Sequence, residues 1–330
     1  MYSSFEQLQP GFFVWYQMIM ALLSPKLSAL QAASMSLRRC FSAAGLALFA
    51  SAACMAGQTP PDPPAAIQPS ELFTHVIAQQ KKSEIELEQF ERVQRIESRK
   101  PGGDTATVET RVFRLFPNGT GLNKLPFPPD GKTSDSTAYR AELEKLEKYL
   151  AWIVQDGSSQ RDAYAKAERR RKERFDLIES THQAFDFTFE GKEMRGSRQL
   201  LRYAMVPRKD YRPTSRMTTL FTKVRGTLWI DEQTSQLAKV EGEVTDDVSL
   251  AIFLAKVNKG SHFMQERYEI APGVWEPSFE QYDFDGRRFF SSFSIHERTF
   301  YTDYKRVGPP RESLPLVRAE LGSLSTQKNQ

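Results

Sequence analysis

Hydrophobic and polar residues alternate over most of the chain beyond residue 184, and this period of two predicts β-strands. Phe185, Phe187 and Phe189 alternate with polar residues at the start of this region. Comparable runs follow at 199–206, 224–230, 238–244, 250–257, 264–270, 279–284 and 289–295. Short polar segments separate the runs, and Asp285-Gly286 is a strong signal for a hairpin turn. The pattern therefore predicts a meander of antiparallel strands.

The segment before residue 131 predicts a helix, two strands and an irregular connection. Residues 70–80 carry hydrophobic side chains at helical spacing after Ser70, a favourable N-cap, and we expect this stripe to pack in the core. The runs 87–96 and 105–116 read as paired strands on either side of a Pro-Gly-Gly turn. Prolines and the Asn-Gly and Asp-Gly pairs of 118–131 then predict a connection without regular structure.

Between residues 137 and 182 the period changes from two to that of a helix. The first helix should bury a stripe spaced alternately by four and three residues: Tyr139, Leu143, Leu146, Leu150 and Ile153. Asp156-Gly157-Ser158 should break it, and Ser159 with Asp162 can cap a second helix. The second helix carries a charged run, 168–174, which we expect to be a solvated face; contact with anionic lipid headgroups is the alternative. We therefore expect a helical hairpin, 137–182, inserted between strands.

The N-terminal region has the pattern of a bacterial export signal. The segment 35–39, which ends with Arg38 and Arg39, precedes an Ala-rich apolar run at 41–50 and small residues at 51–53. The apolar run is shorter than the roughly 20 residues of a membrane-spanning helix. We expect a signal peptide at 35–57, with 1–34 as an extension from an upstream start, and a protein located in the periplasm or at the outer membrane.

The two cysteines of the chain lie in this segment. Cleavage after Ala56 would leave a mature protein without cysteine, whereas cleavage after Ala53 would make Cys54 the first residue. The sequence before Cys54 resembles a lipoprotein lipobox, although Ser51 stands where Leu is usual. Cleavage after Ala52 would leave Cys54 free. Lipidation of Cys54 and ordinary secretion thus both stay open, and a lipid anchor would be the membrane contact of this chain.

Composition indicates where the folded domain begins and ends and which class of ligand is excluded. A proline-rich linker at 58–69 should lead into one folded domain at 70–307, and the polar segment 308–330 should be a disordered tail. Lys and Arg nearly balance Asp and Glu, 45 against 41, which argues against a nucleic-acid-binding protein. We expect a monomer.

The order of elements, together with four short motifs, resembles the fold of LolA-like outer-membrane lipoprotein carriers and of related secreted bacterial proteins. The motifs are Val224-Arg225-Gly226-Thr227-Leu228-Trp229-Ile230-Asp231, Trp275-Glu276-Pro277, Gly286-Arg287 and Tyr301-Thr302-Asp303-Tyr304. The resemblance implies an α+β fold in which a strongly curved antiparallel sheet, a half-barrel, is covered by helices. It further implies a concave apolar surface that holds acyl chains, another lipid-like ligand or an acylated partner.

Side chains of the alternating strands are candidates to line such a surface, although we expect more than half of them to be ordinary core. The candidates are Phe185, Phe187, Phe189, Leu228, Ile230, Phe253, Tyr268, Phe279, Phe289 and Phe293.

The sequence contains no recognisable catalytic motif. Its four histidines are scattered, and neither a zinc-protease helix motif, a G-x-S-x-G elbow nor a glycine-rich phosphate loop is present. The carboxylates Glu266 and Glu269, or Asp283 and Asp285, could form an acid–base pair, but such side chains are usually solvated partners of Lys and Arg. We expect no cofactor, no metal and no enzymatic activity. Three functions stay open: a carrier of a hydrophobic ligand, a lipid-anchored structural or protein-interaction module in the envelope, and a hydrolase.

Overall fold

The computed structural model describes residues 69–99, 108–127, 137–215, 218–251, 255–288 and 291–327. The expected signal peptide, Cys54 and the linker lie outside these residues. The described helices are α2 (Pro69–Leu87), α3 (Thr137–Ile153), α4 (Ser158–Ala184) and α5 (Pro310–Gln327), with a short 3-10 helix η2 (Thr218–Lys223). The strands are β1 (Phe90–Arg99), β2 (Val108–Pro117), β3 (Leu122–Phe127), β4 (Phe185–Arg195), β5 (Arg198–Pro207), β6 (Val224–Asp231), β7 (Leu237–Val244), β8 (Val248–Ala251), β9 (Ala255–Val257), β10 (His262–Ala271), β11 (Val274–Arg288) and β12 (Ser291–Arg306).

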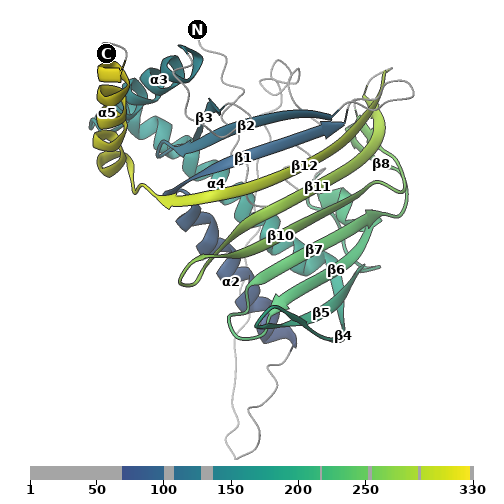
Figure 1. Cartoon of the computed structure of the whole chain (residues 1–330). Helices are drawn as coiled ribbons and strands as arrows, with labels where there is room; N and C mark the ends of the chain where they lie inside the picture. The colour runs from purple at the N-terminus through teal and green to yellow at the C-terminus, as the bar shows by residue number, and fades with distance from the viewer. Residues whose placement is uncertain are drawn as a thin grey trace, which may run out of the picture.

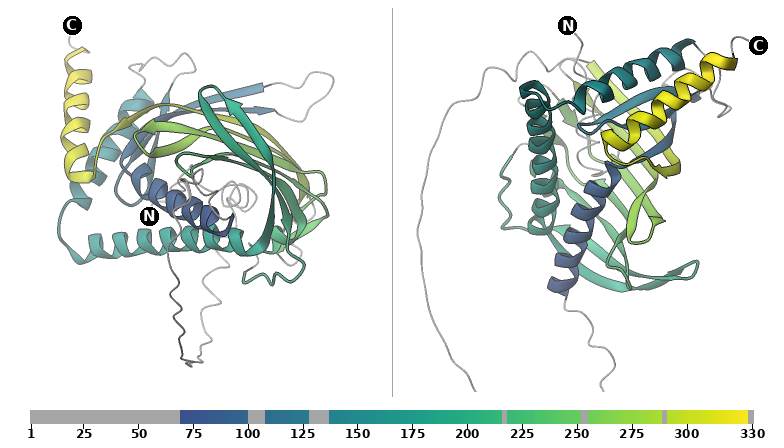
Figure 2. Two further views of the ribbon diagram at one scale, coloured as in Figure 1. Left: turned by 90° about the horizontal axis from the view of Figure 1, so that it is seen from below. Right: turned by 90° about the vertical axis from the view of Figure 1, so that its left-hand side faces the viewer.

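The strands form one 12-stranded sheet in which every described pairing is antiparallel. The main order is β3-β2-β1-β12-β11-β10-β7-β6-β5-β4, so β3 and β4 are the two edges and the sheet does not close. The sheet curls around α2 and α4, which lie behind it in Figure 1 and inside its curve in Figure 2. The predicted α+β class with a curved antiparallel half-barrel is confirmed.

Glycines on the strands let the sheet bend closely around its core. A Cβ atom on Gly242 would lie 2.6 Å from the ring of Phe263, and one on Gly286 would lie 2.5 Å from the ring of Phe293. The missing side chains therefore make room for aromatic rings to lie against the strand. This corrects the hairpin prediction at Asp285-Gly286, because both residues lie inside β11, where Gly286 pairs with Phe293.

Helix α2 fills the concave side of the half-barrel, and α4 lies against α2 (Figure 2). The main hydrophobic core lies between the N-terminal half of α2 and the concave face of the sheet, with Leu72, Phe73 and Val76 contributed by the helix. The helix begins at Pro69, so Ser70 is not its N-cap as predicted; proline fits the first helical position because its missing N–H has no partner there. The helix also runs seven residues beyond the predicted end at residue 80.

Two helices lie between β3 and β4, as predicted, but each packs mainly against other elements, so they do not form a packed hairpin. Helix α3 buries all five residues of its predicted stripe and packs against β3 and α5, whereas α4 packs against α2. The capping prediction for α4 was wrong, because its N-cap is Gly157 and no side-chain hydrogen bond caps it. The two helices thus connect the main core with a second, smaller core.

The predicted disordered tail is wrong. Residues Pro310–Gln327 form α5, which packs against α3 and contributes Leu314, Val317, Leu321 and Leu324 to the second core. Their spacing of three, four and three residues is that of an amphipathic helix. Glu320 of α5 also accepts hydrogen bonds from Arg114 and Tyr139, which ties the helix to β2 and α3.

Two further expectations are corrected near the sheet edges. The predicted irregular connection after residue 117 contains β3, whose Leu122 and Leu125 are buried and which pairs with β2. The predicted single strand at 250–257 is instead the paired strands β8 and β9. The prolines of this segment led to the prediction of an irregular connection. They are compatible with β3 because an edge strand needs no ladder hydrogen bonds on one side.

Candidate functional site

A cavity lies between the concave face of the sheet and the two helices that cover it. Helix α2 contributes Phe73, Val76, Ile77 and Gln80, and α4 contributes Ile178, Thr181 and His182. The sheet contributes Phe187, Met205, Leu228, Leu237, Val240, Gln265 and Arg267. The cavity volume is about 70 Å³. Most of its wall is apolar, and its ceiling consists of α2 and α4.

The chemistry of the concave face changes along one cross-strand row. Directly opposed residues of an antiparallel sheet share a face, and the row runs through Tyr203, Leu228, Val240, Gln265, Glu280 and Thr299. The first three belong to the main hydrophobic core, and the row becomes polar at Gln265. Helix α2 changes in the same direction, from Phe73 and Val76 to buried Gln80, Ser83 and Glu84. The cavity lies at this boundary.

A cluster of buried charged side chains lies next to the polar part of this cross-strand row. Glu84, Glu276, Glu280, Arg92 and Arg267 are each no more than 3% exposed. Burial raises the pKa of Glu84 to about 7, although Arg174 opposes the shift, and it raises the pKa of Glu280 to about 7. The pKa of Glu276 is raised well above its ordinary value for the same reason. Buried carboxyls with perturbed pKa values are a feature of functional sites, and also of structural ion-pair networks.

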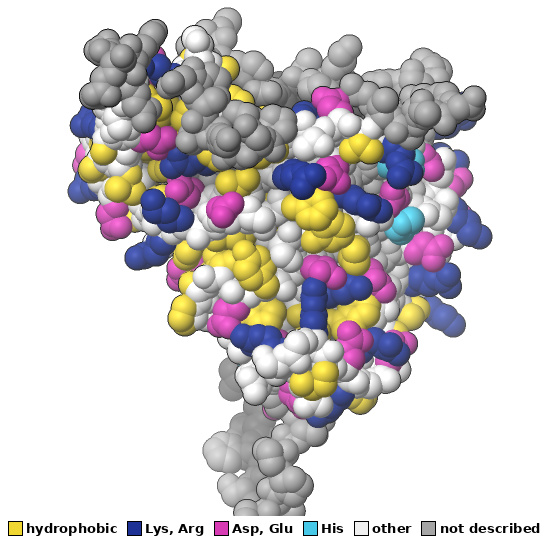
Figure 3. All heavy atoms as spheres, viewed as in Figure 1, with side chains coloured by type: hydrophobic (Ala, Val, Ile, Leu, Met, Phe, Trp, Pro, Cys, Tyr) yellow, Lys and Arg dark blue, Asp and Glu magenta, His cyan; other side chains and the backbone are white. Residues whose placement is uncertain are grey.

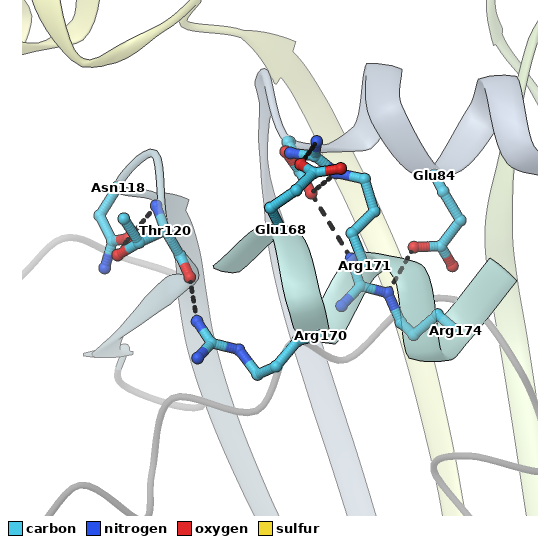
Figure 4. A network of polar contacts seen from close by, with 8 residues as sticks. Glu84, Asn118, Thr120, Glu168, Arg170, Arg171 and Arg174 are labelled. Atoms are coloured by element: carbon cyan, nitrogen blue, oxygen red, sulfur yellow. Dashed lines mark hydrogen bonds and ion pairs between the residues drawn. The ribbon is translucent and has the colours of Figure 1, made fainter. Parts of the chain in front are cut away.

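Arginines of α4 hold that helix against α2 and the β2–β3 turn (Figure 4). Arg174 Nε donates to Glu84 Oε2 at 2.9 Å, and Arg171 Nη2 forms an ion pair with Glu88 Oε2 at 2.5 Å. Arg170 Nη2 donates to the carbonyl oxygen of Thr120 at 2.7 Å. The prediction that the run 168–174 is a solvated face therefore does not hold for its three arginines, which connect α4 to neighbouring elements.

A hydrogen-bonded Ser–His–Asp chain lies on the convex face, which Figure 3 shows as a mixture of basic, acidic and hydrophobic side chains. His296 Nδ1 lies 2.9 Å from Asp283 Oδ1, and His296 Nε2 lies 2.8 Å from Ser294 Oγ. His262 Nε2 lies 3.2 Å from the other carboxylate oxygen of Asp283. Serine hydrolases use the same three residue types in their catalytic triad. This hydrogen-bonded group is therefore the feature to test for the hydrolase alternative.

The other bond of Ser294 argues against a nucleophile. Its hydroxyl donates to Asp285 Oδ1 at 2.6 Å. The serine proton is then directed at a second carboxylate, whereas in a triad it points at the imidazole nitrogen that accepts it. The Asp285 carboxylate would also repel an oxyanion formed beside Ser294. In this geometry His296 lies between Asp283 and Ser294, and the Ser294 hydroxyl donates to Asp285 rather than to the imidazole.

The structure distributes the ten predicted lining residues widely. Phe187 and Leu228 line the cavity, whereas Phe185 and Ile230 are fully packed in the main core and Phe293 packs against it. The other described candidates lie elsewhere: Phe189 and Tyr268 are exposed, and Phe279 packs on Phe300 at the convex face. Phe253 and Phe289 lie outside the described residues.

The prediction missed the ceiling of the cavity and its polar end. The stripe containing Phe73, Val76 and Ile77 was recognised but assigned to core packing alone. Ile178 and His182 lie in α4, where the charged run 168–174 is the most prominent sequence feature and hides the few residues that face the core. Gln265 and Arg267 alternate correctly on β10, but no sequence pattern distinguishes a polar residue on the concave face from one facing solvent.

Within the described residues, no group of three or more His, Cys, Asp or Glu side chains is arranged to hold a metal ion. None of the described helices has both the length and the hydropathy needed to cross a membrane.

No family model matches the chain, and no curated protein matches it. Three similar solved structures illustrate the structural comparison. A DUF1329 family protein from Desulfovibrio piger is 13% identical, with 72% of this chain and 92% of the other covered and a TM-score of 0.29. An outer membrane lipoprotein-sorting protein domain from Vibrio parahaemolyticus is 11% identical, with 70% and 91% covered and a TM-score of 0.30. A LolA superfamily protein from Nitrosomonas europaea is 11% identical, with 73% and 94% covered and a TM-score of 0.26.

Similarity at this level carries no inference about ligand, partner or cellular location. The description of the fold as a half-barrel is based instead on the strand order and on the helices that cover the concave face. The LolA-like layout expected from the sequence, with an opening helix, an open curved antiparallel sheet and a helical insertion, is the layout of this chain.

Proposed function

We propose that this chain is an exported envelope protein that takes up a hydrophobic, acyl-chain or lipid-like ligand between its concave sheet and helices α2 and α4. The observation that carries the proposal is the apolar cavity at this place, with walls from both helices and from five strands. Ligand sites are typically concave and mostly apolar, with a few polar groups at defined positions. The export pattern at 35–57 supports a location in the envelope.

The volume of the cavity means that uptake requires the helices to move. Small-molecule sites usually measure about 300–1,000 Å³, whereas this cavity measures about 70 Å³. The C-terminal end of α4, residues 178–182, is the part that can make room, because its polar contact to α2 is the solvent-accessible Lys81–Glu179 ion pair, whereas the buried Arg174–Glu84 pair lies outside this end. A solvent-accessible ion pair can be exchanged for water at low net free energy, so an apolar ligand could displace this end of the ceiling without unfolding the sheet.

A lipid-anchored structural or protein-interaction module is the second candidate. The small cavity favours this alternative, because the chain's own side chains already cover most of the concave face. The two functions differ in one observable property, which is whether a hydrophobic molecule occupies the cavity.

Val240→Phe should abolish ligand uptake by filling the cavity from the sheet side. Val240 lines the cavity, whereas Val206 is 53% exposed, so Val206→Phe is a matched control. Native mass spectrometry of each full-length protein, purified from its own envelope, measures the fraction that carries a lipid-like adduct. We expect an adduct on the unmodified protein and on the Val206 variant and none on the Val240 variant. An adduct equally abundant on all three, with circular dichroism showing that all are folded, would place the ligand elsewhere; no adduct on any would favour the interaction module.

A further inference from the structure

The polar end of the cavity presents a cation and amide groups to an incoming ligand. Arg267, Gln80 and Gln265 line this end, and each is nearly inaccessible to solvent. Among the described residues, Arg267 and His182 are the ionisable side chains that line the cavity. Burial, and to a smaller extent Arg208, lowers the pKa of His182, so this ring is neutral at pH 7. The guanidinium of Arg267 is then the charged group at the wall.

The acidic side chains that accompany Arg267 lie behind the wall. Glu84, Glu276 and Glu280 are buried nearby, but none of them lines the cavity. Gln265 separates Glu280 from the cavity and donates from Nε2 to Glu280 Oε1 at 2.7 Å. Arg267 is oriented by a hydrogen bond from Nη2 to the carbonyl oxygen of Trp275. The residues that line this end are therefore a guanidinium and two amides, and no carboxylate lines the cavity.

The charge of this end persists at neutral pH. Burial lowers the pKa of Arg267 to about 10, which leaves its guanidinium protonated at pH 7. The same burial raises the pKa of Glu84, so part of the nearby negative charge is neutralised by protons. The guanidinium at the wall thus keeps its charge, and the carboxyl of Glu276, which opposes the fall in the pKa of Arg267, lies behind it.

The apolar and polar ends are separated along α2. Phe73 and Gln80 are seven residues apart on this helix, which corresponds to about 10 Å along its axis. Phe73 stacks on Phe187, with ring centroids 4.0 Å apart, so the opposite end of the cavity is aromatic. Along this stretch of α2 the cavity wall is thus aromatic at one end and cationic at the other.

We infer that the ligand class is a single-chain amphiphile with an anionic head, either a carboxylate or a phosphate monoester, whose head lies at Arg267, Gln80 and Gln265 and whose chain lies along α2. This inference rests on the proposed function, because it assumes that the cavity is the site of uptake. Charge-assisted hydrogen bonds from a guanidinium to an oxyanion are stronger than bonds between neutral groups, which gives the head its selectivity.

Binding of a series of ligands with one chain and different heads tests the inference on the unmodified full-length protein. Dodecanoate, dodecyl phosphate, dodecanol and dodecyltrimethylammonium are compared below their micelle concentrations by displacement of a fluorescent acyl probe. We expect one or both anions to bind about 10- to 100-fold more tightly than the alcohol, and the ammonium to bind most weakly. The two anions distinguish a fatty-acid head from a phosphate head.

Variants locate the head. Arg267→Met should remove the preference for anions and leave dodecanol binding within about threefold. Gln80→Leu replaces a side chain of α2 at the same end and should weaken anion binding by a smaller factor, which keeps the test open if the Arg267 variant does not fold. Arg170→Met, remote from the cavity, should bind as the unmodified protein does.

The outcomes separate the two proposals. Equal affinity for all four amphiphiles, or tighter binding of the ammonium, overturns the anionic head but leaves uptake of a hydrophobic ligand standing. An anion preference that survives both cavity variants also overturns the assignment of the head to this end. Failure of all four to bind overturns the proposed function together with the inference.

Discussion

Arg174→Met should lower the free energy of unfolding by about 3–5 kcal/mol, the range observed when one partner of a buried ion pair is removed. Arg174 donates to Glu84 at 2.9 Å and lies 3.5 Å from Glu88, and Glu84 is only 1% exposed. The substitution leaves the Glu84 carboxyl buried without its main compensating charge. The loss is measured by urea denaturation at pH 8, where Glu84 is mostly ionised.

Two further variants distinguish this explanation from a general loss of packing. Arg170→Met removes the single hydrogen bond to the Thr120 carbonyl and should cost about 1 kcal/mol. The double variant Arg174→Met, Glu84→Leu replaces the ion pair by apolar side chains and should recover most of the lost stability. Equal losses in the two single variants, or no recovery in the double variant, would show that the Glu84–Arg174 pair does not hold α4 against α2.

Glu280→Gln should stabilise the protein by about 3 kcal/mol at pH 8 and hardly at all at pH 4. Burial raises the pKa of Glu280 from its ordinary 4.5 to about 7 in the folded state, a difference worth about 3 kcal/mol. The folded state binds the proton more tightly, so stability contributed by the protonated form is lost as pH rises from about 4.5 to about 7 and is constant above that range. Glutamine keeps the neutral form at every pH; its amide oxygen can accept from Gln265 Nε2, as the carboxylate does, and its amide nitrogen can donate to the Tyr301 oxygen.

Glu243→Gln is the control for this prediction. Glu243 and Arg225 form an exposed ion pair on the convex side of β6 and β7, which should be worth less than about 1 kcal/mol. The difference in unfolding free energy between pH 4 and pH 8 should therefore shrink in the Glu280 variant and not in the Glu243 variant. If both variants keep the pH dependence of the unmodified protein, the buried carboxyl is not its source.

The regular parts of the fold follow from local patterns. The stripe from Tyr139 to Ile153 predicted α3 and its buried face because period and burial coincide in a helix with one apolar side. Phe185, Phe187 and Phe189 predicted β4 by strict alternation. A turn prediction and the prediction of a disordered tail failed, because each rested on a local signal that has another role in the fold. Gly286 provides space for Phe293 rather than a hairpin, and the polar segment after residue 308 carries enough hydrophobic residues to form α5 once α3 offers a surface.

The candidate site depends on contacts that no local pattern contains. Alternation identified Phe187 and Leu228 as residues of one face, but the covering side chains come from α2 and α4, about 100 residues apart in the chain. The arginines of the run 168–174 look solvated in the sequence because their partners Glu84, Glu88 and Thr120 are distant in sequence. The burial of Arg267 likewise depends on where α2 comes to lie.

Uptake by a protein whose helices α2 and α4 are reversibly joined tests the central claim most directly. Lys81 and Glu179 form an ion pair between these helices, so both are replaced by cysteine in a chain in which Cys40 and Cys54, the two natural cysteines, have become serine. A bis-methanethiosulfonate reagent joins the new pair, and a reductant releases it. We expect a dansyl-labelled fatty acid to bind only after reduction, because the cavity is too small unless the helices separate. Equal binding before and after reduction would contradict entry of a ligand beneath these helices.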